Sequence, residues 1–377
     1  MTADFAGLRI AYFTEWSPYQ ANGVLRKLIG QIDAWRELGV DARLFALAAR
    51  HQAGPTADFA RVGAAFGRFT QDSLERWPWL RLGYVNKIAS GAQVAKAIRS
   101  FRPDLLYYRQ QGPWYPGLGV LLKIAPTVIE INTDEFAEIR IWHPVLGRGL
   151  AALQGMVHKR ASGFVAVTHE IGSRWLTFGK PVAVVPNSFW GDQPPEVPAS
   201  GNSQPRFVFI GSRLTGESDW HGVDKILCLA RSVPHRDFHL IGLSRGDFAG
   251  VDVPGNVVFH GRQDPAGVAS IFSQCDVGIG SLAMHRTNLD EGCPLKVRDY
   301  LMHRMPVVIG YREAEVSLNH APYVLQLPNT EDSIPANVDR IVAFGDHWCN
   351  RRVPDDLAFM SRRSAETRRL KFLSGLT

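Results

Sequence analysis

Short β-rich runs alternate with helical segments along most of this chain, and the alternation is interrupted once, by a proline-rich segment. That segment, residues 191–205, reads GDQPPEVPASGNSQP and holds four prolines and almost no apolar residue. Continuous strand–helix–strand alternation is typical of a parallel sheet that helices cover on both faces. The pattern therefore predicts two α/β domains joined by an interdomain linker at 191–205.

The two predicted domains share one rhythm. In the first, residues 1–190, we predict a helix at 23–38 and strands at 9–13, 40–45, 105–108, 127–131, 164–168 and 182–185. In the second, residues 206–354, we predict strands at 207–210, 238–241, 257–259, 277–279 and 307–309, and helices at 223–232, 265–274 and 295–302. The last segment, 355–377, is predicted to be a basic helix, and whether it crosses back to the first domain stays open.

Composition limits the class of protein. A length of 377 residues suits two domains, and 45% hydrophobic with 21% charged residues is the balance of a soluble globular protein. This balance excludes a disordered chain, a coiled coil and a collagen-like repeat. The 42 Lys and Arg residues exceed the 36 Asp and Glu residues, which leaves a net charge of +6. Such a charge suggests an anionic ligand or surface and does not require nucleic acid.

Targeting and metal-binding signals are not evident in the sequence. The start, MTADFAGLRIAYF, has no basic region ahead of an apolar run, and no apolar run reaches the roughly 18 to 20 residues of a membrane-spanning helix. The four cysteines form no CxxC pair and no Cys/His metal spacing; they are Cys228, Cys275, Cys293 and Cys349. We therefore expect a cytoplasmic protein with reduced thiols.

The most informative stretch is residues 290–308, DEGCPLKVRDYLMHRMPVV. It follows the predicted strand 277–279 and turns into a helix at Pro294, a residue type suited to the first helical position. A helix N-terminus offers free N–H groups and a positive dipole end, which favour phosphate. Glu291 precedes this helix and Asp299 lies inside it, so the two carboxylates can accept hydrogen bonds from hydroxyls on different parts of a bound nucleotide.

This stretch resembles the Glu-x7-Glu signature of retaining GT-B glycosyltransferases of family 4, of the polysaccharide-biosynthesis type. Other segments are also similar to the family's motifs: Asn22-Gly23-Val24, His158–Ala161 with Thr168 after it, Val184–Asn187 and Gly211–Leu214. The resemblance covers most of the chain. It implies an α/β GT-B fold, in which two Rossmann-like domains face each other across a cleft. The first domain would then bind the acceptor and the second the nucleotide sugar.

The resemblance also implies an activity. A family member moves a sugar from a nucleotide diphosphate sugar, UDP- or GDP-linked, to a glycan, lipid-linked or small-molecule acceptor, with retention and without a metal or other cofactor. The setting would be the assembly of a bacterial surface polysaccharide or glycoconjugate. Nucleic acid is not an expected partner.

The same resemblance assigns roles to residues. Glu291 would hold the donor sugar, Asp299 the ribose and Arg213 the diphosphate, while Gly23 would let the backbone of the first domain approach the donor. Glu291, Arg213 and His221 are the candidate catalytic residues. Neighbours in the signature complete the candidate donor site: Gly292, Cys293, Pro294, Leu295 and Lys296.

The second domain departs from the family pattern in two places. Where the family usually has a Lys-Gly pair after the arginine, this chain has Trp220-His221-Gly222. Either His221 binds phosphate, as a neutral donor or an imidazolium, or Lys225 one turn along the helix supplies the charge. Asp299 stands where the family has glutamate, and it either reaches the nucleotide or pairs with Arg298 or Lys296. Lys296 faces either the diphosphate or solvent.

The first domain departs from the pattern after strand 127–131. Many relatives have a histidine there, and this chain has Asn132-Thr133-Asp134-Glu135. Arg109, which follows the predicted strand 105–108, either holds an acidic acceptor or phosphate, or pairs with Glu130 or Asp134.

A basic and aromatic stretch at 61–102, which includes Trp77, Trp79 and Tyr84, has two interpretations. It is either a solvent-exposed extension of the first domain with a small core, or a surface that contacts an anionic membrane. In the second case the protein would be peripheral at the inner face of the membrane.

Two rival functions also fit the pattern. One is a nucleotide-sugar epimerase of the same GT-B fold, and the other is a non-catalytic GT-B partner subunit.

Overall fold

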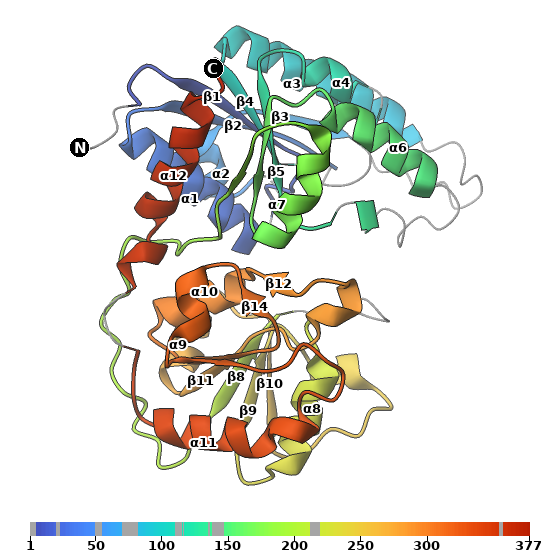
Figure 1. The fold of residues 1–377 in the computed structure, drawn as a ribbon. Helices are drawn as coiled ribbons and strands as arrows, with labels where there is room; N and C mark the ends of the chain where they lie inside the picture. The colour runs from blue at the N-terminus through green and yellow to red at the C-terminus, as the bar shows by residue number, and fades with distance from the viewer. Residues whose placement is uncertain are drawn as a thin grey trace. The chain divides into compact units, whose positions relative to one another are not determined.

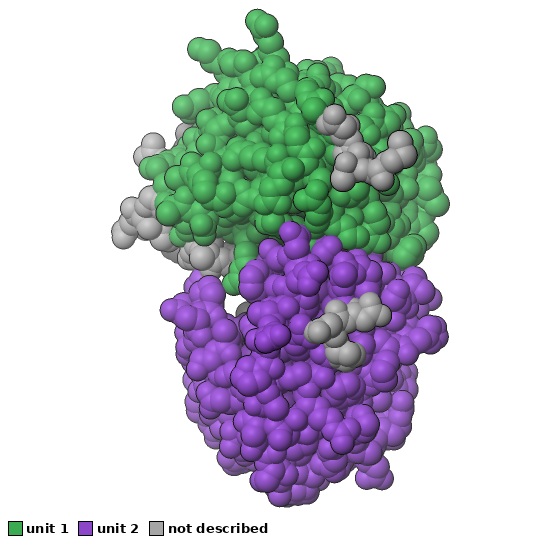
Figure 2. Space-filling view, turned by 90° about the vertical axis from the view of Figure 1, so that its left-hand side faces the viewer, with its two compact units in different colours: residues 1–185, 362–377 green, residues 186–361 purple. Residues whose placement is uncertain are grey.

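The structure, a computed structural model, describes residues 5–19, 23–49, 55–69, 82–109, 115, 117–134, 136–137, 147–211, 219–353 and 357–377. It divides into two compact units, which Figure 2 distinguishes by colour. Unit 1 comprises Met1–Val185 and Arg362–Thr377, and unit 2 comprises Pro186–Ser361. No helix among the described residues has the length and apolar character needed to cross a membrane.

The boundary between the units differs from the linker that we predicted at 191–205. It lies between Val185 and Pro186, and the proline-rich segment belongs to unit 2. There the carboxylate of Asp276 holds the segment, because its Oδ2 accepts a hydrogen bond of 2.8 Å from Asn202 Nδ2. A segment poor in apolar residues is thus fixed by a buried polar group, which composition alone does not indicate.

Unit 1 is built on a seven-stranded parallel sheet in the order β3-β2-β1-β4-β5-β6-β7. The strands are β1 (Arg9–Thr14), β2 (Asp41–Ala49), β3 (Gly63–Phe69), β4 (Leu105–Arg109), β5 (Thr127–Ile131), β6 (Gly163–Ala166) and β7 (Val182–Val184). The helices are α1 (Gly23–Glu37), α2 (Ala57–Val62), α3 (Leu82–Phe101), α4 (Leu118–Leu121), α6 (Gly147–His158), α7 (His169–Trp175) and α12 (Arg362–Ser374). The predicted parallel α/β class is confirmed for this unit.

The edge strand β3 was not among the predicted strands. Its sequence, GAAFGRF, holds two glycines, which are depleted in strands because they offer no side chain to pack. The structure explains Gly67: a Cβ there would lie 2.8 Å from Val94 Cγ2 and 2.9 Å from the carbonyl oxygen of Ser90, both on α3. Close packing of α3 on β3 therefore requires glycine at position 67, and this same glycine makes the strand hard to predict from the sequence.

The C-terminal helix α12 lies beside α1 in unit 1 (Figure 1). Trp35 Nε1 on α1 donates a 2.7 Å hydrogen bond to Glu366, and Arg369 donates one of 2.8 Å to the hydroxyl of Tyr107 on β4. Two of the basic residues of this helix therefore interact with unit 1: Arg369 is buried, and Arg362 pairs with Glu37 at 3.0 Å.

Unit 2 is built on a six-stranded parallel sheet in the order β10-β9-β8-β11-β13-β15, with a two-stranded sheet β12-β14 beside it. The strands are β8 (Phe207–Ile210), β9 (Phe238–Ile241), β10 (Val257–Gly261), β11 (Val277–Ile279), β12 (Glu291–Gly292), β13 (Val307–Ile309), β14 (Arg312–Glu313) and β15 (Val324–Gln326). The helices are α8 (Val223–Ser232), α9 (Pro265–Ser273), α10 (Leu295–Met302) and α11 (Val338–Trp348). Of these elements, β12, β14, β15 and α11 were not predicted.

Both sheets have the doubly wound Rossmann order, as predicted. The chain winds outward from β1 in unit 1 and from β8 in unit 2, and then returns to add β4 and β11 on their other sides. Ligands of such sheets bind beyond the carboxyl ends of the strands, at the point where the order reverses. In unit 2 this point is flanked by the segments that follow β8 and β11.

Candidate functional site

In unit 2, the segment that precedes α8 lies against the segment that follows β11. The N–H of Leu282 donates a 3.1 Å hydrogen bond to the carbonyl of His221, and that of Ala283 donates one of 3.3 Å to the carbonyl of Trp220. Gly222 ends the first segment at a φ of 68°, a conformation that favours glycine. The strand order and these backbone hydrogen bonds together place His221 at the switch point of the sheet.

Lys296, in the first turn of α10, reaches the same place. Its Nζ lies 3.0 Å from His221 Nδ1 and 3.9 Å from the ring centroid of Phe209 on β8. The side chain is buried, so it does not face solvent, and it makes no ion pair with any carboxylate that the structure describes. Burial lowers the pKa of Lys296 well below its ordinary value, against an opposing effect of Asp219. A buried cation without an ion-pair partner is costly unless an anion binds beside it.

His221 is neutral in this environment. Burial, followed by the charge of Lys296, lowers the pKa of His221 to about 2. A neutral imidazole whose Nδ1 accepts the proton of Lys296 keeps its proton on Nε2, which is then a hydrogen-bond donor.

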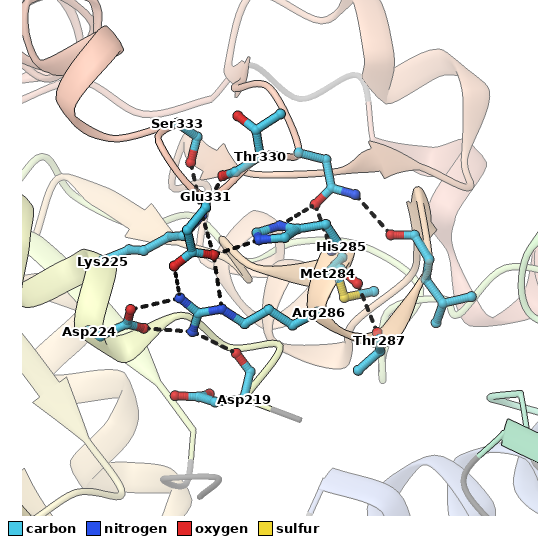
Figure 3. Close-up of polar contacts among 12 residues, drawn as sticks. Asp219, Asp224, Lys225, Met284, His285, Arg286, Thr287, Thr330, Glu331 and Ser333 are labelled. Carbon is cyan, nitrogen blue, oxygen red and sulfur yellow. Dashed lines mark hydrogen bonds and ion pairs between the residues drawn. The ribbon is translucent and has the colours of Figure 1, made fainter. Parts of the chain in front are cut away.

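Lys225, the alternative source of charge, is directed elsewhere. Its Nζ donates hydrogen bonds to the carbonyl of Thr330, at 2.5 Å, and to Ser333 Oγ, at 3.3 Å (Figure 3). It also lies 4.0 Å from a carboxylate oxygen of Glu331. These contacts tie α8 to the segment 330–333, and they give Lys225 partners that Lys296 lacks.

Glu291 is held by a very short sheet. It is the first residue of β12, and it is buried with 3% of its surface exposed. β12 pairs in parallel with β14, through a 2.9 Å hydrogen bond from the N–H of Arg312 to the carbonyl of Asp290. A Cβ at Gly292 would lie 3.0 Å from Cδ2 of Tyr311, so this ring packs closely against β12. A buried carboxylate is thus fixed at the entrance to α10.

Arg298 connects the signature to the start of unit 2. Its Nε donates a 2.6 Å hydrogen bond to the carbonyl of Asn187, and its NH2 lies 2.8 Å from both Cys293 Sγ and a carboxylate oxygen of Glu313. Asn187 in turn donates a 2.6 Å hydrogen bond to the carbonyl of Cys293. The predicted alternative in which Asp299 pairs with Arg298 is therefore wrong, and Asp299 does not pair with Lys296 either.

Pro294 does not occupy the first helical position, as we predicted, but the position before it. It is the N-cap residue, and α10 begins at Leu295. The cap makes no side-chain hydrogen bond. The N–H groups of the first turn are consequently not capped by the side chain of Pro294, which suits them to an anion. Lys296 and Asp299 are three positions apart on this helix and therefore share a side of it.

The segment 284–290, which leads to Glu291, is fixed by a network around Arg286 (Figure 3). The guanidinium of Arg286 binds both carboxylate oxygens of Asp224 on α8, at 2.9 and 2.8 Å, and also binds Glu331. His285 Nε2 lies 2.7 Å from Glu331 Oε2, and the His285 N–H donates a 2.9 Å hydrogen bond to Asn329. We infer that these contacts position Glu291, a role that the sequence analysis missed because the partners are far apart in the chain.

Three buried oxygen atoms around these segments have no hydrogen-bond partner in the described structure. They are Asn187 Oδ1, Asp219 Oδ1 and Ser281 Oγ. Burial, followed by the charge of Asp224, raises the pKa of the Asp219 carboxyl. Buried polar atoms are nearly always paired, so these three oxygen atoms are available to a ligand or to water.

Two predicted site residues cannot be compared with this geometry. Arg213 lies in 212–218, outside the described residues. Gly23 is exposed and begins α1, but the residues before it, 20–22, also lie outside the described part. Within the described residues, no group of three His, Cys, Asp or Glu side chains is arranged to hold a metal ion.

In unit 1, the alternatives for Arg109 and for the 61–102 stretch are partly resolved. Arg109 pairs with Glu130, at 3.5 Å, whereas Asp134 pairs with Arg174 at 2.5 Å. Phe66 packs on Phe59 with ring centroids 5.9 Å apart, as expected of a small core. The two tryptophans, at 77 and 79, lie outside the described residues.

Comparison with known proteins supports the resemblance that the sequence predicted. Residues 21–189, less than half of the chain, match the model of Glycosyltransferase Family 4. No curated protein matches the sequence.

Solved structures extend the comparison to the whole chain. An E. coli structure described as trehalose-6-phosphate bound with UDP-2-fluoro glucose has a TM-score of 0.57 at 13% identity, and covers 98% of each chain. An α-glucosyltransferase in complex with UDP-glucose and DNA containing an abasic site has a TM-score of 0.58 at 12% identity, and covers 97% of this chain and 99% of its own. The UDP-GlcNAc 2-epimerase of Methanocaldococcus jannaschii has a TM-score of 0.55 at 8% identity, and covers 98% of this chain and all of its own. At these identities the likeness shows the fold, and the predicted two-domain fold is confirmed.

Proposed function

We propose that this chain, which has the GT-B fold and whose residues 21–189 match the model of Glycosyltransferase Family 4, transfers a sugar from a nucleotide diphosphate sugar to an acceptor. The observation that carries the proposal is the buried cation of Lys296, which has no ion-pair partner among the described residues and lies at the switch point of the unit 2 sheet. A diphosphate is the anion that such a donor carries. UDP is the first nucleotide to test, because the solved glucosyltransferase holds UDP-glucose.

In this proposal the diphosphate binds Lys296 and the neutral His221. Nucleotide diphosphate is the leaving group, so negative charge grows on it as the sugar bond breaks. Lys296 neutralises that charge in a buried place where electrostatic interactions are strong, and His221 donates a hydrogen bond from Nε2. The N–H groups at the start of α10 add to this stabilisation. Arg213 is proposed as a further cation for the same group.

The two carboxylates of the signature bind hydroxyls. Glu291, fixed by β12 and the Arg286 network, is proposed to accept hydrogen bonds from the donor sugar and so to orient its anomeric carbon. Asp299, on the same side of α10 as Lys296, is proposed to hold the ribose. Transfer with retention and without a metal ion is part of this proposal, as is an acceptor on the way to a surface polysaccharide or glycoconjugate.

Binding of the diphosphate should be coupled to proton uptake. Burial lowers the pKa of Lys296 in the free protein, and a bound anion, which favours the charged form, raises this pKa again. Nucleotide affinity should therefore fall as pH rises, and binding should take up a proton. Calorimetry over a series of pH values, each in two buffers of different ionisation enthalpy, measures this uptake. In Lys296→Met the uptake should disappear, and equal binding heats in both buffers for the wild-type protein would contradict the assignment.

An epimerase is the second candidate, since an epimerase shares the fold at a TM-score of 0.55. Product analysis distinguishes the two reactions. An epimerase converts UDP-GlcNAc to its epimer without any other substrate, whereas a transferase releases UDP and needs an acceptor or water. We expect no epimer and acceptor-dependent release of UDP from a panel of UDP- and GDP-sugars. Accumulation of an epimer without nucleotide release would overturn the transferase proposal.

Contact with an anionic membrane is a separate proposal. It rests on the basic and aromatic residues of 61–102 and would make the protein peripheral at the inner face of the membrane. The protein should pellet with vesicles that contain anionic lipid and remain in solution with neutral ones. Added salt should reduce the pelleted fraction, because screening weakens the attraction of exposed charges. Pelleting that is absent or indifferent to salt would remove this proposal.

A further inference from the structure

A second cluster of buried charges lies in unit 1, at the carboxyl ends of β4 and β5. Arg109 and Glu130 are directly paired in the parallel register of these strands. Glu130 is fully buried, and its carboxylate lies 2.6 Å from Lys27 Nζ on α1 and 3.5 Å from Arg109. The hydroxyl of Tyr12 on β1 donates a 2.8 Å hydrogen bond to the same carboxylate. Two cations therefore converge on one carboxylate.

The surrounding groups do not balance this second positive charge. Arg369 on α12 faces the cluster, but it is paired with Glu366 at 2.9 Å. The other facing groups, Tyr12, Tyr107, Gln31 and Asn132, are neutral at physiological pH, since burial raises the pKa of both tyrosines. In the described part of unit 1, the cluster thus carries one positive charge in excess.

A neutral amide occupies the position where a carboxylate would balance the cluster. Asn132 Oδ1 accepts hydrogen bonds from Lys27, at 3.1 Å, and from Arg109, at 3.2 Å. Arg109 Nε is buried and has no hydrogen-bond partner within the described structure. Burial lowers the pKa of Lys27 to about 8, against the opposing effect of Glu130. The cluster holds both cations close together but leaves some of their hydrogen-bonding capacity unused.

The position of the cluster favours a ligand. Arg109 is the last residue of β4 and is paired in register with Thr14, the last residue of β1. The strand order of unit 1 reverses between these two strands, so the cluster lies at the edge where doubly wound sheets bind ligands. Arginine and lysine together recognise oxyanions such as phosphate and carboxylate.

We propose that Lys27 and Arg109 bind an oxyanion group, a phosphate or a carboxylate, on the acceptor. That this oxyanion belongs to an acceptor rests on the proposed transferase function, whereas the anion site itself does not. The consequence is a substrate class: acceptors with a phosphoryl group or an acidic sugar should be used, and neutral ones should be used poorly.

Asn132→Asp is the decisive variant. It places a carboxylate between Lys27 and Arg109 without changing the size of the side chain. This carboxylate should itself bind the two cations and so exclude an external anion. Because it also cancels the excess charge, the thermal midpoint of the protein should stay the same or rise. A variant that remains folded and no longer binds anions cannot be explained by a loss of structure.

The test is titration of the 377-residue protein with inorganic phosphate and, separately, with glucuronate, at a saturating concentration of whichever of UDP and GDP binds, so that the donor site is filled. We expect at least one of the two to bind, and Asn132→Asp and Arg109→Leu each to weaken that binding by about tenfold or more. Arg61→Gln, which removes an exposed cation of the same unit, should have no effect. The probe that binds identifies the source, phosphoryl or carboxylate.

Two results would overturn the anion site. One is the absence of binding of both probes to the wild-type protein, and the other is unchanged binding in Asn132→Asp. Failure of the proposed transferase function has a different signature, namely that neither UDP nor GDP binds. In that case the phosphate titration is made on the Lys296→Met background, in which the cation of unit 2 is removed, and the result for Asn132→Asp still decides.

Discussion

Replacing Glu291 with glutamine should reduce sugar transfer about a hundredfold or more while leaving nucleotide affinity nearly unchanged. Glutamine keeps the size of the side chain and removes its charge. If Glu291 accepts hydrogen bonds from the donor sugar, the loss affects the orientation of the anomeric carbon and not the nucleotide. Steady-state kinetics with the donor that the panel identifies, together with calorimetry of the free nucleotide, separate the two effects.

The residue before Glu291 provides a matched control. Asp290→Asn makes the same chemical change one residue earlier, at an exposed position whose carboxylate accepts a hydrogen bond from Asn329. It should leave the transfer rate near that of the wild-type protein. Asp299→Ala, in contrast to Glu291→Gln, should weaken nucleotide binding about tenfold, because it removes a charged hydrogen-bond acceptor. Equal and mild effects of Glu291→Gln and Asp299→Ala would mean that the site is misplaced.

Breaking the Arg298–Glu313 pair should cause the largest loss of stability. Both side chains are fully buried or nearly so, and their ion pair of 2.8 Å connects α10 to β14. Glu313→Gln leaves the buried Arg298 without its carboxylate, and such a change costs about 3–5 kcal/mol. Hydrogen exchange followed by mass spectrometry reads the effect separately in each unit, and we expect lost protection in peptides of 186–361.

The control for this prediction is in the same unit. Arg231 and Asp252 form an exposed pair at 3.6 Å, and Arg231→Gln should cost less than about 1 kcal/mol. Protection in unit 1 should be unchanged in both variants. If Glu313→Gln exchanged no faster than Arg231→Gln, the buried pair would not stabilise unit 2 and the support that we assign to β12 and β14 would be lost.

Strands and helices with a dense apolar pattern were predictable from the sequence. β8, β9, β11 and α8 have the predicted bounds, since each is a mostly buried short run or a strongly periodic helix between turn residues. β3 was not predictable because its glycines serve a close helix contact. β12 and β14 have two residues each, too few for any periodicity, and they are defined by pairing with each other.

The sequence predicts residues for the candidate site, and this assignment stays a prediction, but it does not predict the contacts between those residues. The signature and the proline before α10 indicated where a donor would bind. The sequence did not decide between His221, Lys225 and Lys296, because the decision depends on which segments meet in space. Likewise, the contacts of Arg286 join residues about 45 and 62 positions apart. Local patterns carry no signal for such pairs.

The proposed function requires a nucleoside diphosphate site in unit 2, and calorimetric titration of the 377-residue protein with UDP and with GDP tests for this site directly. We predict that one of the two binds, that Lys296→Met weakens this binding about tenfold or more, and that Lys225→Met changes it little. No binding of either nucleotide would contradict the account and favour a non-catalytic GT-B subunit. Equal affinity in the wild-type protein and Lys296→Met would contradict the role of Lys296.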